Sequence, residues 1–186
     1  MAVVLLTGMS GVGKSTVLAE LIRLGHRGVD TDRGGWVEQV LVAGQAHPES
    51  LWRADRMTAL LDGHTAGHLF LAGTVANQGA FYDRFAAVVL LTVPVEVALD
   101  RLATRTTNDF GKREAERARI VADFAEVEPL LRRRATLVIH TRRPLTEVVA
   151  AVLQVAEDAA RRPADPAQSA VRRGSGCDLP STSGGA

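Results

Sequence analysis

A glycine-rich segment near the amino end has the residue types and spacing of a phosphate-binding loop. It reads Gly8-Met9-Ser10-Gly11-Val12-Gly13-Lys14-Ser15 and fits the pattern G-x-x-x-x-G-K-S/T at every fixed position. Such a loop turns its backbone N–H groups inward, and the next helix adds partial positive charge at its amino end. The Lys14 ammonium can reach the β- and γ-phosphates, and the Ser15 hydroxyl can ligate Mg²⁺. The segment predicts nucleotide binding through Gly8, Gly11, Val12, Gly13, Lys14, Ser15 and Thr16.

Lysine is rare elsewhere in the chain. Of the 22 basic residues only Lys14 and Lys112 are lysines, and the others are arginines. A sequence that uses arginine almost everywhere keeps lysine at the loop position where an ammonium group is needed. This observation favours a phosphate-binding loop over a chance match in an ordinary glycine turn.

Two aspartates, Asp30 and Asp32, stand at the end of a second short segment that is expected to be a strand. In open α/β folds, ligands bind at the edge formed by the carboxyl ends of the strands. Because side chains alternate along an extended chain, both carboxylates can project to one side. One carboxylate can then approach the water shell of a bound metal, and the other can approach an acceptor hydroxyl. The alternative is a purely structural pair, one aspartate capping a helix and the other exposed in a loop.

Length and composition limit the classes of protein to consider. The chain has 186 residues, 46% of them hydrophobic, which suits one folded domain. Its net charge of +1 removes the global electrostatic argument for binding nucleic acid. No apolar run reaches the roughly 18 to 20 residues that span a bilayer, and a single cysteine, Cys177, forms no internal disulfide. We expect a cytoplasmic protein without nucleic-acid or membrane partners, whose oligomeric state is open and compatible with a monomer.

The segments that must position these residues alternate between short apolar strands and longer helical stretches. Strands are predicted at Ala2–Thr7, Arg27–Thr31, His68–Ala72, Val88–Val93 and Thr136–Thr141. Helices are predicted at Lys14–Leu24, Ser50–Leu61, Gln78–Phe85, Val95–Arg105, Glu114–Arg133 and Leu145–Arg161. Nearly unbroken Val, Leu and Ile runs are typical of strands covered on both faces. The pattern predicts an α/β fold of the P-loop NTPase type, a three-layer, doubly wound, five-stranded parallel sheet.

The folded domain is expected to span residues 1–162. The remaining residues, 163–186, include three Pro, four Gly and four Ser but few large apolar side chains. This composition predicts a disordered tail.

Taken together, these motifs resemble the small P-loop kinases, namely the nucleoside monophosphate kinase group and especially shikimate kinase and its metabolite-kinase relatives. The resemblance covers about residues 2–155 and rests on the phosphate loop, Asp30, Asp32, Arg101, Arg105 and the segment Thr141-Arg142-Arg143-Pro144. It implies that Asp30 helps to hold Mg²⁺ and that Asp32 contacts the acceptor hydroxyl. It also implies that Arg142 and Pro144 pack on adenine.

Arg101 and Arg105 lie one helical turn apart and share a helix face. The resemblance makes Arg101 a residue that stacks on adenine and Arg105 a catalytic contact to the transferring phosphate. The polar segment at about 106–113 stands where these kinases carry a mobile lid, whose closure excludes water. A solvated helix face is the alternative for both arginines.

Fewer residues point to the acceptor. Arg53 and Arg56 lie where this fold grips an anionic acceptor such as a carboxylate or a phosphate. Gly73 opens a small polar turn, 73–79, that can line the same pocket with backbone N–H groups and amides. Shikimate kinase would carry a Gly-Gly-Gly run at this turn, and its absence argues against shikimate itself.

The resulting prediction is an ATP- and Mg²⁺-dependent kinase that acts on a metabolite hydroxyl, with Lys14, Asp32 and Arg105 as catalytic residues. A nucleoside monophosphate kinase is the first alternative, and a nucleotide-binding sensor without phosphoryl transfer is the second. A regulatory GTPase is disfavoured, because Asp32 follows Ser15 by only 17 residues and the chain has no Asn-Lys-x-Asp motif.

Overall fold

The centre of the structure, a computed structural model that describes residues 1–41, 48–106 and 110–162, is a five-stranded sheet in the order β2-β5-β1-β6-β7. All adjacent strands run parallel. The strands are β1 (Ala2–Thr7), β2 (Arg27–Asp30), β5 (His68–Ala72), β6 (Ala87–Thr92) and β7 (Leu137–His140). Their bounds differ from the predicted ones by at most one residue at either end, and the predicted fold class is confirmed. The predicted tail, 163–186, lies outside the described residues.

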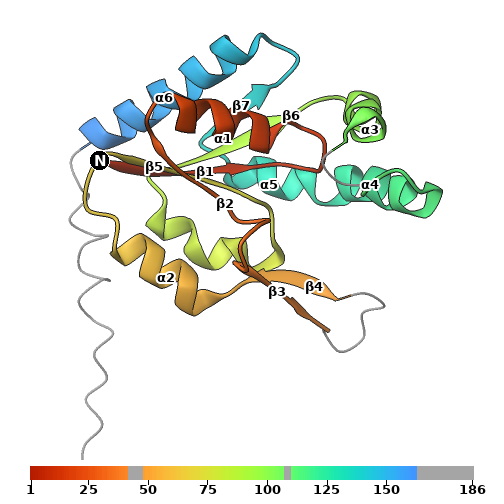
Figure 1. Ribbon diagram of the computed structural model, residues 1–186, viewed down its shortest axis with the longest axis horizontal. Coiled ribbons are helices and arrows are strands. Elements are labelled where there is room, and N and C mark those ends of the chain that lie inside the picture. The colour runs from red at the N-terminus through yellow and green to blue at the C-terminus, as the bar shows by residue number, and fades with distance from the viewer. Residues whose placement is uncertain (42–47, 107–109, 163–186) are drawn as a thin grey trace, which may run out of the picture.

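Helices cover both faces of this sheet (Figure 1). One face carries α1 (Lys14–Arg23) and α6 (Leu145–Arg161), and the other carries α2 (Ala54–Asp62) and the 3₁₀ helix η1 (Ala76–Arg84). The connection from β6 to β7 contains α3 (Val95–Thr104), α4 (Glu114–Glu126) and α5 (Glu128–Arg134). Among the described residues, no helix combines the length and the apolar character that crossing a bilayer requires.

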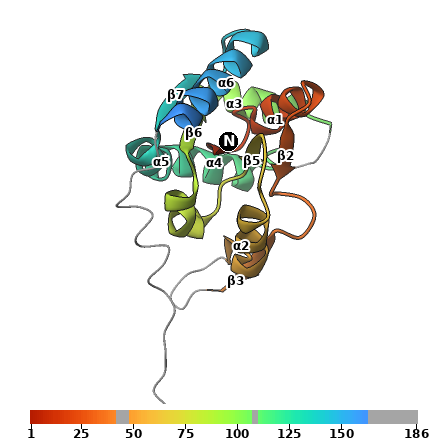
Figure 2. The ribbon, with the colours of Figure 1, turned by 90° about the vertical axis from the view of Figure 1, so that its left-hand side faces the viewer.

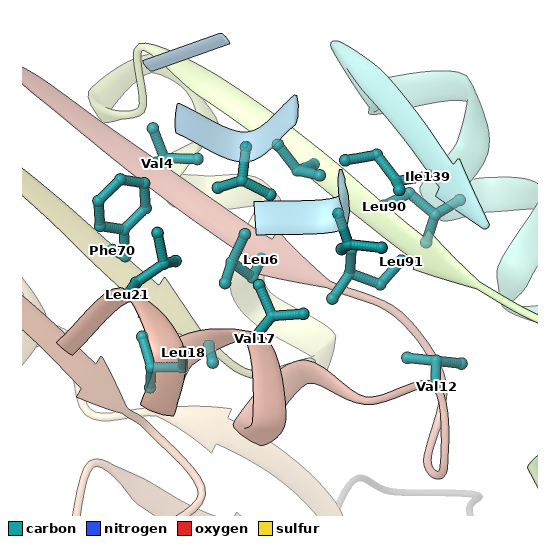
Figure 3. Packing of buried hydrophobic residues seen from close by; sticks show 14 of the residues in the cluster. Val4, Leu6, Val12, Val17, Leu18, Leu21, Phe70, Leu90, Leu91 and Ile139 are labelled. Atoms are coloured by element: carbon teal, nitrogen blue, oxygen red, sulfur yellow. The ribbon is translucent and has the colours of Figure 1, made fainter. Parts of the chain in front are cut away.

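Alternate residues of β1 enter two hydrophobic clusters. Val4 and Leu6 face α1 and pack with Val17 and Leu21 in the first cluster (Figure 3). Leu5, between them, belongs to the second cluster on the opposite face. This alternation follows from the two-residue period of a strand. Because β1 is buried on both faces, its carboxyl end is held in place, and the loop that follows it begins there.

A β-hairpin stands where the sequence predicted the start of a helix. β3 (Val37–Val40) and β4 (Glu49–Trp52) pair antiparallel, so the predicted helix Ser50–Leu61 is wrong at its beginning, and α2 starts only at Ala54. The hairpin lies away from the main sheet, on the side that carries α2 (Figures 1 and 2). Trp52 explains the extended backbone, because its fully buried ring packs against Phe81 and its Nε1 donates to Thr31 Oγ1 over 3.0 Å.

Two other predicted helices also need correction. The helix predicted at Glu114–Arg133 is divided at Val127 into α4 and α5, and Pro129 falls in the first turn of α5. Proline lacks the N–H group that a continuous helix would use, but the first turn of a new helix tolerates it. The helix predicted at Gln78–Phe85 is the 3₁₀ helix η1.

Candidate active site

The phosphate loop joins β1 to α1 at the carboxyl edge of the sheet. Gly13 directly precedes α1 with a φ of 100°, in the left-handed region that residues with a Cβ rarely adopt. Gly11 has a φ of 83°, and a Cβ there would lie 2.6 Å from the backbone oxygen of Ala98 in α3. Both positions therefore require glycine. Gly13 also has no side chain with which to cap α1, so the first N–H groups of the helix suit an oxygen ligand.

Lys14 is held inside the loop. Its Nζ donates to the backbone oxygen of Gly8 over 2.6 Å and to that of Met9 over 3.2 Å. Burial lowers the pKa of the Lys14 ammonium, whereas the carboxylates of Asp32 and Asp30 raise it. A desolvated cation interacts more strongly with phosphate oxygens than one in water does.

Ser15 and Asp30 meet beside this ammonium. The Ser15 hydroxyl donates to Asp30 Oδ2 over 3.1 Å, and Asp30 Oδ1 accepts from the backbone N–H of Asp32 over 3.1 Å. One hydroxyl and one carboxylate are oxygen donors of the kind that Mg²⁺ prefers, and Mg²⁺ usually keeps several waters as its remaining ligands. The pair fits Mg²⁺ without a larger acidic cluster, and the described residues contain no group of three or more His, Cys, Asp or Glu side chains arranged for a metal.

Asp32 lies on the loop after β2, within electrostatic reach of Lys14. Partial desolvation, the largest cause, raises the pKa of its carboxyl, and Asp30 acts in the same direction. Lys14 and Arg33 oppose this by lowering the pKa. A carboxylate whose proton affinity is raised is a better acceptor for the proton of a hydroxyl.

A pocket of about 370 Å³ opens beside Asp32 and is lined by Asp32, Val37, Gln39, Ser50, Thr74 and Val75. Thr74 connects it to the phosphate loop, because its hydroxyl donates to the backbone oxygen of Gly8 over 2.8 Å and accepts from the N–H of Gly8 over 3.1 Å. We call this cavity the acceptor pocket. The predicted turn at 73–79 does line it, whereas Val37, Gln39 and Ser50 come from the hairpin that the sequence did not predict.

A second pocket, of about 300 Å³, lies on the other side of the loop and is lined by Gly13, Thr16, Val17, Arg101, Thr141, Arg143, Leu145 and Val148. We call this cavity the nucleotide pocket. The guanidinium of Arg101 donates to Thr141 Oγ1 over 2.9 Å and to the backbone oxygen of Thr141 over 2.8 Å. The hydroxyl of Thr141 donates in turn to the backbone oxygen of Val12 over 2.6 Å. The end of β7, α3 and the phosphate loop are thus tied together.

The loop after β7 presents different residues from those expected. Arg143 and Leu145 line the nucleotide pocket, whereas Arg142 and Pro144 are exposed on the same loop and are not among the lining residues. Arg143 also forms an ion pair with Glu147 over 2.9 Å. Contacts from Arg142 and Pro144 to adenine stay a prediction.

Arg105 follows α3 and points toward the segment predicted as a lid. Its Nη2 donates to the backbone oxygen of Phe110 over 3.1 Å. Its charge also lowers the pKa of Lys14, which places the two cations within electrostatic reach of each other. Residues 107–109 of the predicted lid lie outside the described residues.

Two arginines expected at the acceptor have other contacts. Arg56 donates to the backbone oxygens of Gly34 and Gly35, each over 2.7 Å, and its guanidinium stacks 4.5 Å from the centre of the Trp36 ring. Arg53 lies 3.9 Å from Asp55. Neither arginine lines the acceptor pocket.

Gly73 has a steric role. A Cβ at this position would collide with Thr31 Oγ1 and would lie 3.7 Å from Asp32 Oδ1. Only glycine therefore lets the turn after β5 pass this close to the loop that carries Asp32. Contact between Gly73 and a substrate stays a prediction.

Comparisons with known proteins identify the family and the fold of the chain. The sequence matches the AAA domain family over residues 4–122, well over half of the chain. No curated protein sequence gives a significant match.

Several solved structures share the fold. Shikimate kinase from Acinetobacter baumannii, in complex with shikimate, superposes with a TM-score of 0.58 at 20% identity, over 87% of this chain and 96% of that one. Shikimate kinase from Aquifex aeolicus gives a TM-score of 0.55 at 22% identity, over 86% and 98%. Deoxyadenosine kinase from M. mycoides, with bound dATP, gives 0.51 at 12% identity, over 83% and 98%. The chain belongs to the AAA domain family and has the fold of the small P-loop kinases.

Proposed function

We propose that this protein is a Mg²⁺-dependent kinase that transfers the γ-phosphoryl group of ATP to a hydroxyl of a small metabolite. The observation that carries the proposal is the position of the phosphate loop between two pockets. Gly13 lines the nucleotide pocket, and Thr74, which is bonded to Gly8 at the other end of the loop, lines the acceptor pocket. A donor and an acceptor bound on the two sides would meet at Lys14.

Each residue of the site has a separate role in an in-line transfer of the phosphoryl group. Asp32 accepts a hydrogen bond from the acceptor hydroxyl, whose oxygen attacks the γ-phosphorus while the bond to the bridging oxygen breaks. The proton of the hydroxyl is transferred to the Asp32 carboxylate or to the new phosphate ester. Lys14 and Arg105 offset the negative charge that moves toward the leaving group. Ser15 and Asp30 would hold Mg²⁺, which would supply further charge neutralisation on the phosphates.

The nucleotide base is assigned to the second pocket. Arg101 is held by Thr141 at its wall, and Arg142 and Pro144 follow Thr141 on the same loop. We also propose that ATP is the donor and that the protein is cytoplasmic.

The test is a panel of hydroxylated metabolites incubated with ATP and Mg²⁺, read by ADP release and by phosphorus NMR of the product. Asp32→Asn should lower kcat about a hundredfold or more while the Kd for ATP stays close to that of the wild type. The matched control is Glu38→Gln on the outer side of the hairpin, which removes a charge without entering either pocket. Binding of ATP without transfer to any acceptor would instead favour a nucleotide sensor.

A further inference from the structure

The acceptor pocket contains one carboxylate and no lining cation. Its polar groups are the Asp32 carboxylate, the Gln39 amide, and the hydroxyls of Ser50 and Thr74, and its apolar groups are Val37 and Val75. Among the described residues that line it there is no Lys or Arg, so its formal charge is negative. The cation of the phosphate loop, Lys14, donates hydrogen bonds to the backbone oxygens of Gly8 and Met9.

The register of the hairpin explains which side chains reach the pocket. Val37 pairs with Trp52, and Gln39 pairs with Ser50, so these four residues share one face of the hairpin. The amide of Gln39 donates to Ser50 Oγ over 2.9 Å, which fixes both groups. Glu38, on the opposite face, points away from the pocket. The inner face therefore offers an amide and a hydroxyl, which suit the hydroxyl groups of a ligand.

None of the arginines near Asp32 and the hairpin is among the residues that line the pocket. Arg56 is fixed by the carbonyls of Gly34 and Gly35, and Arg53 lies beside Asp55. Arg33 lies 4.0 Å from Asp30, with 74% of its side chain exposed to solvent. The hairpin connection at 42–47 reads Val-Ala-Gly-Gln-Ala-His and contributes neither Lys nor Arg to the sequence.

Lys14 and Arg33 act on Asp32 through space but do not line the pocket, so an anionic acceptor would meet the Asp32 carboxylate there without a lining cation. Like charges at close range are repulsive, and a carboxylate or phosphate that loses water without gaining a charged partner is strongly disfavoured. An uncharged hydroxyl can donate to Asp32, and an amino group can in addition pair with its charge.

We propose, on the basis of the kinase function above, that the acceptor is a polyhydroxylated compound that bears neither carboxylate nor phosphate, either uncharged or carrying an amino group. Val37 and Val75 supply the apolar contact for a ring or carbon skeleton, while Gln39, Ser50 and Thr74 bind its hydroxyls. Monophosphates and hydroxy acids are excluded from this class of substrate.

The experiment compares acceptors in sets that share one carbon skeleton, such as glucose, glucosamine and glucuronate, or adenosine and its monophosphate. Initial rates are measured with ATP and Mg²⁺, and binding to the ADP-loaded protein is followed separately by ligand-observed NMR. The best acceptor should be a neutral or amino member, with a kcat/KM about tenfold or more above that of its acidic counterpart. Transfer that favours the acidic member would overturn the inference and leave the kinase function standing.

The binding measurement separates the two proposals. If neutral or amino members bind but none is phosphorylated, the proposed kinase function fails and the inferred ligand class stands. If no member of any set binds, or if only acidic members bind, the inferred ligand class is wrong.

A pair of hairpin variants tests the role of the pocket charge. Gln39→Arg places a cation on the inner face and should shift the ratio of acidic to neutral acceptor binding about tenfold toward the acid. Val40→Arg adds the same charge on the outer face of the same strand, where Val40 is 37% exposed, and should leave the ratio unchanged. Equal ratios in the two variants would show that the pocket does not select by charge.

Discussion

Single residues set the electrostatics of the site. Lys14 is constrained by its own loop, because its Nζ donates to the backbone oxygens of Gly8 and Met9. Opposing effects act on its pKa, which burial lowers and two nearby aspartates raise. The loop thereby holds a partly buried positive charge at the point where the β- and γ-phosphates are expected.

Lys14→Ala should abolish turnover and weaken ATP binding about tenfold or more, since hydrogen bonds to charged groups contribute roughly 1.5 to 3 kcal/mol. Calorimetric titration with ATP and Mg²⁺ measures the affinity, and thermal melting confirms that the variant folds. A variant that binds ATP as tightly as the wild type would contradict the proposed role of the ammonium.

The pH dependence of activity should report Asp32. Its carboxyl has a raised pKa, and the proposed mechanism needs the ionised form, so kcat/KM should fall as the pH drops through that pKa. Arg33 lowers the pKa of Asp32, and Arg33→Gln should therefore move the acid limb of the profile to higher pH. Arg27→Gln, at the other end of β2, is the control that should leave the limb in place. A shift to lower pH in Arg33→Gln would refute the assignment.

Site residues that belong to a local sequence motif could be predicted. Hydrogen-bond partners that are distant in the sequence could not. Lys14 and Ser15 follow from the loop pattern alone. The bonds from Thr74 to Gly8 and from Thr141 to Val12 join residues 66 and 129 positions apart, and nothing in the local sequence marks those hydroxyls as part of the loop.

Contacts between elements keep the two pockets in place. The hydroxyl of Thr141 links β7 to the phosphate loop and accepts from Arg101 of α3. Thr141→Val keeps the shape of the side chain but removes this hydroxyl. It should lower the free energy of unfolding by about 1 to 3 kcal/mol and weaken nucleotide binding severalfold. Urea unfolding and calorimetry measure the two effects, and unchanged values for both would show that the link is not structural.

Asn77 should hold the hairpin in place, as Thr141 holds the elements around the nucleotide pocket. Its side chain accepts from the backbone N–H of Trp52 over 2.8 Å and donates to the backbone oxygen of Trp52 over 2.9 Å. Asn77→Asp keeps the acceptor and loses the donor, so it should raise the KM for the acceptor while the Kd for ATP stays the same. A specific loss of nucleotide affinity instead would mean that the hairpin also supports the nucleotide pocket.

The hairpin was the main element that the sequence did not reveal. Four of the five sheet strands are mainly apolar runs and are recognised as such, whereas β3 and β4 carry Glu38, Gln39 and Ser50, and each has only four residues. Their extended conformation depends on the burial of Trp52 against Phe81, which is a tertiary contact. The part of the acceptor pocket that this hairpin supplies was therefore also missed.

The candidate active site and the histidine pair His26 and His68 lie at opposite ends of the central sheet. The phosphate loop follows the last residue of β1, whereas His68 begins β5 and pairs with Ala2 at the first residue of β1. His68 packs beside His26 and Phe70, and its buried Nδ1 has no hydrogen-bond partner among the described residues. Titration of His68 should therefore change stability without changing the chemistry of the candidate site.

Desolvation is the main reason that the pKa of His68 lies below its usual value. The charges of His26, the N-terminal amine and His64 act in the same direction, and Glu157 opposes them. The unfolded chain therefore binds the proton more readily than the folded one, and stability should fall as the pH drops below about 6.5. His68→Phe removes the titrating group, so the fall in Tm between about pH 7.5 and 5.5 should be smaller than in the wild type. Kinase activity at neutral pH is the control and should be unaffected, because His68 lies far from both pockets. An equally steep fall in Tm in the variant would assign the acid sensitivity to other groups.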